Sequence, residues 1–195
     1  MDKLPTEFAR AFLAMEKGES QYTFIVNTLI YTARNVIARN AVNMGFDRVL
    51  WLDSDILVEP DTMTKLAADM DQGRDYVSGV YYMRTLPTKP VVYTDVWWKV
   101  NADNVETGSK NVEQMPDGIF EIAGSGFGCA MTSAKLLTAM VDRYGAPFAP
   151  LMGMSEDLSF CWRVQQAGIK MYCDPAVKVG HIGQYVYTEG DWRNE

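Results

Sequence analysis

The chain has 195 residues, of which 48% are hydrophobic and 22% charged, as is usual for a globular domain with a sizeable core. Its formal net charge of −7 disfavours nucleic acid as the main partner, because binding to phosphate chains depends on clustered Lys and Arg. The sequence has no apolar run near the roughly 20 residues that cross a bilayer, and its first residues lack the pattern of a signal peptide. We therefore expect a cytoplasmic protein with one domain over 1–195 and no membrane span.

Hydrophobic periodicity and turn residues divide the chain into alternating helices and strands. The first part is expected to contain a helix at 5–17, a strand at 22–26, a helix at 31–44, a strand at 48–53, a helix at 60–71 and a strand at 76–82. The rest is expected to contain strands near 90–97 and 119–123, helices at 134–143 and 156–167, and strands near 169–173 and 177–182. The polar stretch 101–118 is expected to form a long loop or a hairpin. This order predicts an α/β fold with a mostly parallel, doubly wound sheet and helices on both faces.

Two aspartates follow a strand that is expected to be buried on both faces. Val49-Leu50-Trp51-Leu52 shows no alternation, and Asp53-Ser54-Asp55 comes directly after it. Open α/β sheets bind ligands at the carboxyl ends of their strands. Side chains two apart on an extended segment point the same way, so Asp53 and Asp55 are expected to aim at one hard cation. A second copy of the pattern, Asp69-Met70-Asp71, falls at the end of a predicted helix and is interpreted as solvated surface.

A second acidic group, Ser155-Glu156-Asp157, opens the helix predicted at 156–167. Ser is a preferred N-cap, and acidic residues in the first turn favour the helix dipole, so helix capping alone would explain these residues. At 3.6 residues per turn, however, Asp157 shares a face with apolar residues and Glu156 shares one with polar residues. An acidic side chain that points inward costs energy unless it is paired or functional. Asp157 is therefore the candidate general base, and Glu156 the candidate helix-capping or supporting residue.

The single histidine and a glycine-rich run add further indications. His181 lies near the end of the chain, after an apolar strand, and a lone histidine is more often structural than functional. An imidazole beside two carboxylates would complete a nitrogen and oxygen site that suits Mn²⁺ better than Ca²⁺. The run Gly124-Ser125-Gly126-Phe127-Gly128 is either a tight turn between strands or a flat backbone surface that a ligand can approach closely.

Two other pairs of residues have both a structural and a functional interpretation. Arg34-Asn35 lies early in a predicted helix, where Arg34 is either an exposed helical residue or a bidentate contact for a phosphate or carboxylate. Trp97 or Trp98 could stack on a sugar ring. Neighbouring strand residues face opposite sides, so at most one of them does so.

Taken together, these residues resemble a GT-A-fold glycosyltransferase, most closely the family 2-like members common in bacteria and phages. The likeness covers roughly residues 22–183 and depends on the order of its motifs: Arg-Asn, the DxD motif Asp-Ser-Asp, Gly-Ser-Gly-Phe-Gly, Ser-Glu-Asp-Leu-Ser-Phe-Cys and Val-Gly-His-Ile-Gly. It implies a Rossmann-like sheet and an enzyme that moves a sugar from a nucleotide-diphosphate sugar, with a UDP-sugar favoured, to an acceptor hydroxyl. Such enzymes typically open with a short apolar strand, which is absent here.

The resemblance also implies roles for individual residues. It makes Asp55 a ligand of Mn²⁺ or Mg²⁺, with Asp53 on the metal or the ribose and His181 as the late metal ligand. It makes Asp157 the base of an inverting reaction, with Glu156 beside it. The residues expected at the donor are Arg34, Asn35, Asp53, Ser54 and Gly126.

Several functional alternatives stay open at this point. The chain could be a nucleotide-sugar or nucleotide-binding module without turnover. It could also be a sugar nucleotidyltransferase, although such enzymes usually carry a Gly-rich phosphate loop with Arg and Lys. The acceptor is open as well and includes a glycan, a protein, a small molecule and a modified DNA base.

Overall fold

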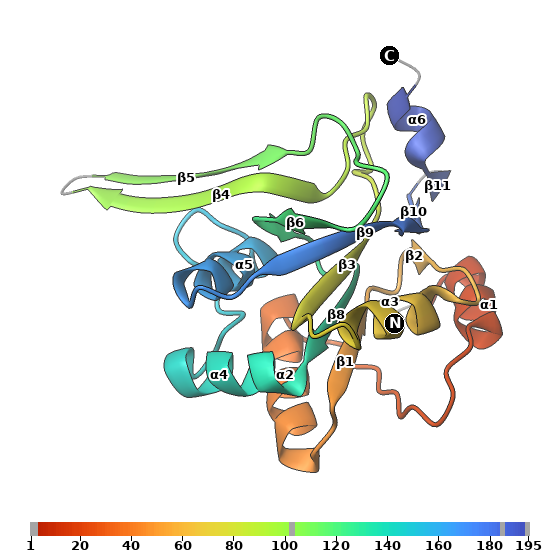
Figure 1. Ribbon diagram of the computed structural model, residues 1–195, viewed down its shortest axis with the longest axis horizontal. Helices are drawn as coiled ribbons and strands as arrows, with labels where there is room; N and C mark the ends of the chain where they lie inside the picture. The colour runs from red at the N-terminus through yellow and green to blue at the C-terminus, as the bar shows by residue number, and fades with distance from the viewer. Residues whose placement is uncertain (1–3, 102–103, 184–185, 194–195) are drawn as a thin grey trace.

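The computed structural model describes residues 4–101, 104–183 and 186–193. Its central sheet has five strands in the order β1-β8-β3-β9-β6. These strands are β1 (Arg48–Leu52), β8 (Cys129–Ser133), β3 (Tyr76–Val80), β9 (Met171–Lys178) and β6 (Phe120–Ile122). Figure 1 shows this sheet at the centre of the molecule, with a long hairpin reaching out to one side.

The central sheet is mixed, and the prediction of a mostly parallel, doubly wound, Rossmann-like sheet is wrong. Among the described residues, β3 and β9 form its one parallel pair, whereas β1–β8, β3–β8 and β6–β9 are antiparallel. An apolar run without alternation indicates that a strand is buried on both faces. The apolar run of β1 does pack against both cores, with Val49 and Trp51 on one face and Leu50 and Leu52 on the other. It does so as an edge strand, in which Trp51 alone is fully buried. The sequence pattern therefore carried information about burial and not about direction.

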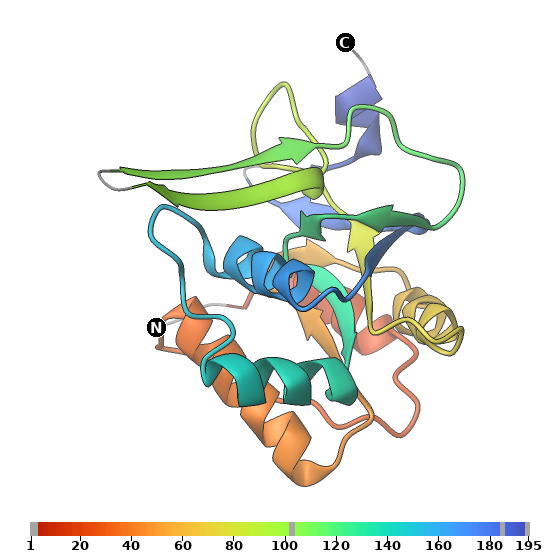
Figure 2. The same cartoon turned by 60° about the vertical axis from the view of Figure 1, so that its left-hand side comes forward.

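Helices cover both faces of the central sheet (Figure 2). One core joins the sheet to α2 (Ile30–Met44), α4 (Ala134–Tyr144) and α5 (Glu156–Gln166). The other core includes residues of α3 (Thr62–Met70), and α1 (Thr6–Ala14) packs against it. Successive strand residues point to opposite faces, so Tyr76 lies in the first core and Val77 in the second.

Two small sheets flank the central one. In the first, β10 (Gly180–Ile182) pairs with β2 (Ile56–Leu57) and β11 (Val186–Tyr187), and α6 (Glu189–Arg193) follows. In the second, β4 (Val92–Asn101) pairs with β5 (Asn104–Asn111) and β7 (Gly124–Ser125). The hairpin β4–β5 takes up the start of the polar stretch 101–118, of which 102 and 103 lie outside the described residues.

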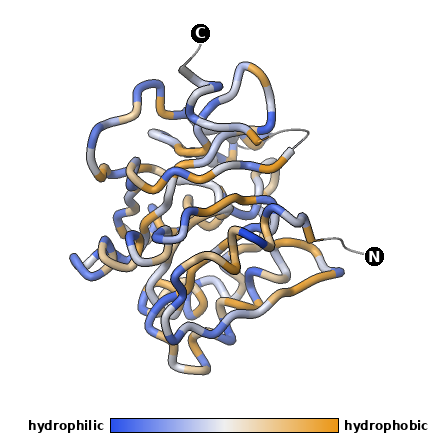
Figure 3. Tube along the Cα trace, turned by 90° about the vertical axis from the view of Figure 1, so that its right-hand side faces the viewer, coloured by the Kyte–Doolittle hydropathy of each residue, from blue (hydrophilic) through white to orange (hydrophobic). Residues whose placement is uncertain are grey.

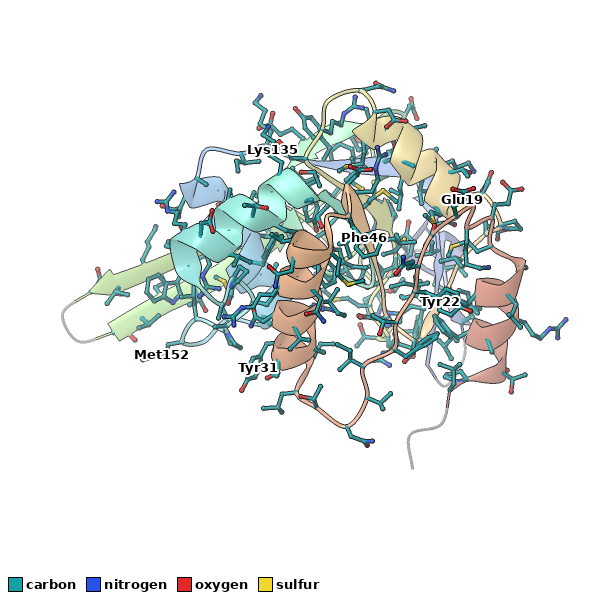
Figure 4. All side chains as sticks on the ribbon, turned by 90° about the horizontal axis from the view of Figure 1, so that it is seen from below. Glu19, Tyr22, Tyr31, Phe46, Lys135 and Met152 are labelled. Atoms are coloured by element: carbon teal, nitrogen blue, oxygen red, sulfur yellow. The ribbon has the colours of Figure 1, made fainter. Side chains whose placement is uncertain are left out.

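The predicted strand at 22–26 is also wrong, because these residues have no regular secondary structure. Figure 4 shows Tyr22 on the connection between α1 and α2. The rings of Tyr22 and Phe24 pack edge-on against Phe12 of α1 and remain exposed. Aromatic and β-branched residues favour a strand where a pleated neighbour packs against them, and here a helix is the neighbour.

The other predicted helices and strands are found, with shifted ends. The pair of strands expected near 169–173 and 177–182 is instead one long strand, β9, followed by the short β10. Figure 3 shows hydrophobic stretches of the trace crossing the interior and hydrophilic stretches at many of the outer bends. None of the helices in the described part of the chain is long and apolar enough to span a membrane.

An acidic pair connects α3 to the central sheet. Asp69 is partly buried near the end of α3, and its Oδ2 atom finds no hydrogen-bond donor among the described residues. Its acidic neighbour is Asp174 on β9. Burial, and then the charge of Asp174, raises the pKa of Asp69 to about 6. Two ionised carboxylates cannot bond to each other, so a bond between them requires a shared proton. The interpretation of Asp69 as solvated surface is therefore incomplete, whereas Asp71 is exposed and pairs with Arg48.

This pair predicts a specific dependence of stability on pH. Because the pKa of Asp69 is raised in the folded state, its contribution is fully present below about pH 4 and is lost as the pH rises through about 6. Asp69→Asn keeps a donor facing Asp174 at every pH and should remove the effect, which we expect to be on the order of 1 kcal/mol after solvent screening. Urea unfolding of both proteins between pH 4 and 7 measures it, and parallel stability curves would contradict the shared proton.

Candidate functional site

A turn at the end of β1 gives the two aspartates of the DxD motif different partners. The amide of Asp53 donates to the carbonyl of Gly128 at 3.1 Å, and the amide of Ile56 donates to the carbonyl of Asp53 at 3.1 Å. The second bond closes a turn over Ser54 and Asp55, so the segment is no longer extended. This differs from the expectation that both carboxylates point the same way, which holds only for extended backbone.

Arg34, Asp53 and Glu156 form one group of side chains, named here the Arg34 cluster. The guanidinium of Arg34 donates to Oδ1 and Oδ2 of Asp53 at 3.0 and 3.2 Å and to Oε1 of Glu156 at 2.8 Å. It also lies 5.3 Å from the ring centroid of Phe127. Arg34 is only 4% exposed, so it is not the exposed helical arginine that one interpretation suggested. A buried guanidinium is tolerated where carboxylates neutralise it.

Asp55, Arg84 and His181 form a second group, named here the Asp55 cluster. Nη1 of Arg84 donates to Oδ2 of Asp55 at 2.9 Å, and Nε2 of His181 lies 3.5 Å from the same oxygen. The antiparallel pairing of β10 with β2 places His181 opposite Ile56, directly after Asp55. A residue near the end of the chain thus reaches the DxD turn through backbone pairing.

The hydrogen bonds of His181 fix its tautomer. Nδ1 lies 2.7 Å from the carbonyl oxygen of Tyr82, which can only accept, so Nδ1 carries the proton. The ring of Tyr81 packs edge-on against the imidazole at a centroid distance of 5.3 Å. Nε2 therefore faces Asp55. It donates to the carboxylate when the ring is charged, and it offers a lone pair to a cation when the ring is neutral. Such a backbone bond at the second nitrogen is the usual way to orient a metal-binding histidine.

The pair Asp55 and His181 fits a divalent cation in its chemistry and spacing. Two ligand atoms that share one ion at about 2.0–2.2 Å lie roughly 3–3.5 Å apart. Carboxylate oxygen and imidazole nitrogen suit Mn²⁺ or Mg²⁺, which often complete their shell with waters and substrate phosphates. Among the described residues, no group of three His, Cys, Asp or Glu side chains converges on one point. Asp53, the third expected ligand, is instead bonded to Arg34.

Of the two acidic residues that open α5, Glu156 belongs to the Arg34 cluster and Asp157 does not. Glu156 bonds to Arg34, whereas Oδ1 of Asp157 accepts from the amide of Leu158 at 2.7 Å and from the hydroxyl of Ser155. The contrast between an inward Asp157 and an outward Glu156 is wrong, because both are partly buried. The supposedly polar face of α5 is buried too, since Ser159 bonds to the amide of Leu151 and Arg163 to backbone carbonyls of the segment 147–149.

The carboxylates of the two clusters differ in how their pKa values are shifted. Burial raises the pKa of Asp53, and Arg34 offsets part of the rise. Burial followed by the charge of Asp157 raises the pKa of Glu156. For Asp55, burial acts upward, but the hydrogen bond and charge of His181 and the charge of Arg84 outweigh it and lower the pKa. Asp55 is therefore held in the ionised form that a cation requires.

Three residues expected at the donor make contacts within the chain or face solvent. Oδ1 of Asn35 accepts from the amide of Phe148 at 3.0 Å, and Ser54 is exposed. A Cβ atom on Gly126 would lie 1.8 Å from the hydroxyl of Tyr81. The space beside this glycine is therefore filled by Tyr81, where the sequence analysis expected the donor.

The two tryptophans also pack within the chain. Trp97 covers Gly108 on β5. Trp98 packs edge-on against Trp162 and donates to the carbonyl of Met152 at 3.1 Å.

Arg84 is the residue of this site that the sequence analysis missed. It lies four residues after the end of β3 at Val80, in the connection to β4. The carboxyl ends of strands were used to select Asp53 and Asp55. The same rule applied to β3, with attention to cations as well as acids, would have found Arg84.

Comparison with known proteins gives a likeness in fold alone. No family model matches the chain, and no curated protein matches its sequence. The solved structure "Crystal Structure of A197 from STIV" superposes with a TM-score of 0.65 at 20% identity, covering 91% of this chain and 79% of that chain. The apo form of UDP-glucose pyrophosphorylase superposes less well, with a TM-score of 0.46, 8% identity and coverage of 78% and 55%. The chain thus shares its fold with A197.

The burial of Arg34 predicts a large effect of its removal. Arg34→Met leaves the carboxylates of Asp53 and Glu156 without their cation and should lower the free energy of unfolding by about 3 kcal/mol. This is the low end for breaking a buried pair, because the side chain of Asp53 is 37% exposed. Arg39→Met on the same helix is the control, since Arg39 is exposed, and it should cost less than about 1 kcal/mol. Urea unfolding measures both, and equal losses would refute the importance of the Arg34 cluster.

Proposed function

We propose that this chain is a metal-dependent glycosyltransferase that moves a sugar from a nucleotide-diphosphate sugar, with a UDP-sugar favoured, to an acceptor hydroxyl. The observation that carries the proposal is the 3.5 Å approach of His181 to Asp55, in the turn that follows the edge strand β1. In the same turn, Arg34 joins Asp53 to Glu156 at the start of α5. A carboxylate, an oriented imidazole and a separate candidate base are the groups that such a reaction needs.

Asp55 and His181 would hold Mn²⁺ or Mg²⁺ against the diphosphate of the donor. When bound, the ion supplies Lewis-acid neutralisation of the charge on the diphosphate leaving group. The chain contributes the orientation of the two ligands. The carbonyl of Tyr82 holds His181, and the turn from Asp53 to Ile56 holds Asp55.

Asp157 is the general base of the proposed reaction. The acceptor oxygen forms a bond to the anomeric carbon as the bond from that carbon to the diphosphate oxygen breaks, and the acceptor proton passes to Asp157. Attack from the face opposite the leaving group inverts the anomeric configuration. Glu156 is less suited to this role because its carboxylate already accepts a bond from Arg34. Its place is to support Arg34 and Asp53 next to the reacting groups.

Nucleotide binding should depend on Asp55 and not on the other Asp-x-Asp pattern. With Mn²⁺ present, UDP at about 100 times its Kd should stabilise the wild type by about 2.7 kcal/mol, which a thermal shift detects. Asp55→Asn should abolish the shift. The matched control is Asp71→Asn in the second pattern, which should retain it, because Asp71 pairs with Arg48 away from both clusters.

The same thermal-shift screen identifies the preferred nucleotide and distinguishes the alternative functions. Parallel measurements with GDP and dTDP identify the favoured nucleotide. Stabilisation without release of UDP from any UDP-sugar would indicate a binding module without turnover. Formation of pyrophosphate from UTP and a sugar phosphate would indicate a nucleotidyltransferase. Equal shifts for the wild type and Asp55→Asn would refute the cation site.

Turnover should depend far more on Asp157 than on Glu156. Asp157→Asn removes the proton acceptor and should lower kcat by about 10²–10⁴, while the thermal shift with UDP and Mn²⁺ is unchanged. Glu156→Gln should retain turnover within about tenfold, since it weakens a supporting contact. The assay is release of UDP from a UDP-sugar, with water as the acceptor until a better one is found. A larger loss of kcat in Glu156→Gln than in Asp157→Asn would make Glu156 the general base and Asp157 the supporting residue.

A further inference from the structure

Arg84 occupies the position at which a cation would meet Asp55. Its guanidinium contacts Oδ2 of Asp55 at 2.9 Å, the same oxygen that lies 3.5 Å from Nε2 of His181. One carboxylate oxygen thus faces both an imidazole and a guanidinium. A divalent ion bound between Asp55 and His181 would be repelled by a guanidinium at this distance, so the two cations compete for the carboxylate of Asp55.

The stem of Arg84 lies across the backbone of Gly183. A Cβ atom on Gly183 would come within 3.2 Å of Cδ of Arg84 and 3.4 Å of its Cγ. Gly183 follows β10, which carries His181. The same Cβ atom would lie 2.7 Å from the Tyr187 ring, so Gly183 leaves room for Tyr187 as well as for the stem of Arg84.

Arg84 can leave Asp55 without disturbing the core. Its side chain is 51% exposed, and an ion pair at such a surface contributes little to stability. It belongs to a turn that is closed at its base, where the amide of Met83 donates to the carbonyl of Lys89 at 2.9 Å and the hydroxyl of Thr88 donates to the carbonyl of Met83 at 2.6 Å. Figure 1 shows this connection between β3 and β4 rising beside β10. A rotation of the Arg84 side chain, with the backbone of the turn unchanged, is therefore sufficient to release Asp55.

We propose that Arg84 takes the place of the divalent cation on Asp55 and, when the cation binds, turns to the diphosphate of the donor. This inference depends on the proposed function, since it uses the same cation site. A guanidinium released next to a diphosphate can form charge-assisted bonds with its oxygens. Arg84 would then keep Asp55 paired before the cation arrives and bind the donor afterwards. The metal and the donor would thus bind in that order.

The test measures two affinities whose changes have opposite signs. Isothermal titration of Mn²⁺ alone should show about three- to tenfold tighter binding to Arg84→Gln than to the wild type, because a competing cation is removed. Titration of UDP at saturating Mn²⁺ should show about tenfold weaker binding to Arg84→Gln, because a charge-assisted contact is lost. Lys89→Gln is the matched control, since it removes one exposed positive charge from the same turn and should change neither affinity.

The outcomes separate this inference from the proposed function. If the wild type binds Mn²⁺ in a manner that requires Asp55, but Arg84→Gln binds Mn²⁺ no tighter or UDP no weaker, the role of Arg84 is wrong and the glycosyltransferase proposal stands. If Lys89→Gln shows the same changes, the effect is one of net charge and the role of Arg84 is again wrong. If neither the wild type nor Arg84→Gln binds Mn²⁺, both proposals fail. A circular dichroism spectrum of Arg84→Gln that matches the wild type ensures that folded proteins are compared.

Discussion

The buried guanidinium of Arg34 is the interaction on which the arrangement of the site depends. It joins α2 to the end of β1 through Asp53 and to the start of α5 through Glu156. These elements are separated by up to 122 positions in the sequence. A buried cation cannot remain unpaired, so the fold must keep both acidic residues next to it. The acidic pair of α5 is therefore fixed close to the DxD turn even without any ligand.

The pairing of Arg34 also divides the work among the acidic residues. Asp53 and Glu156 neutralise the arginine, which leaves Asp55 and Asp157 as the carboxylates without a bond to Arg34. Asp55 faces His181 and Arg84, and Asp157 lies in the first turn of α5. In the proposed reaction one of these two carboxylates holds the cation and the other accepts the proton. In each acidic pair, Asp53/Asp55 and Glu156/Asp157, one residue thus neutralises Arg34 and the other is available for the proposed reaction.

The sequence predicted which segments form helices and strands better than it predicted the direction of the strands or the partners of individual side chains. Periodicity identified β1, β3, α2 and α5, and it placed the DxD motif at a strand end, because the hydrophobic pattern of a segment is a local property. It could not distinguish a mixed sheet from a parallel one, since both bury their strands on two faces. It also could not show that Glu156 and not Asp157 pairs with Arg34, because that choice depends on how α2 and α5 pack.

The glycines show how a local interpretation can be right about space and wrong about its occupant. Gly126 does permit a close approach, and the group that approaches is the hydroxyl of Tyr81. The amide of Gly128 donates to the same hydroxyl at 3.3 Å. The Tyr81 ring in turn packs edge-on against His181. The glycine run therefore contributes to the site indirectly. It leaves room for Tyr81, and the ring of Tyr81 packs against the imidazole of His181 that faces Asp55.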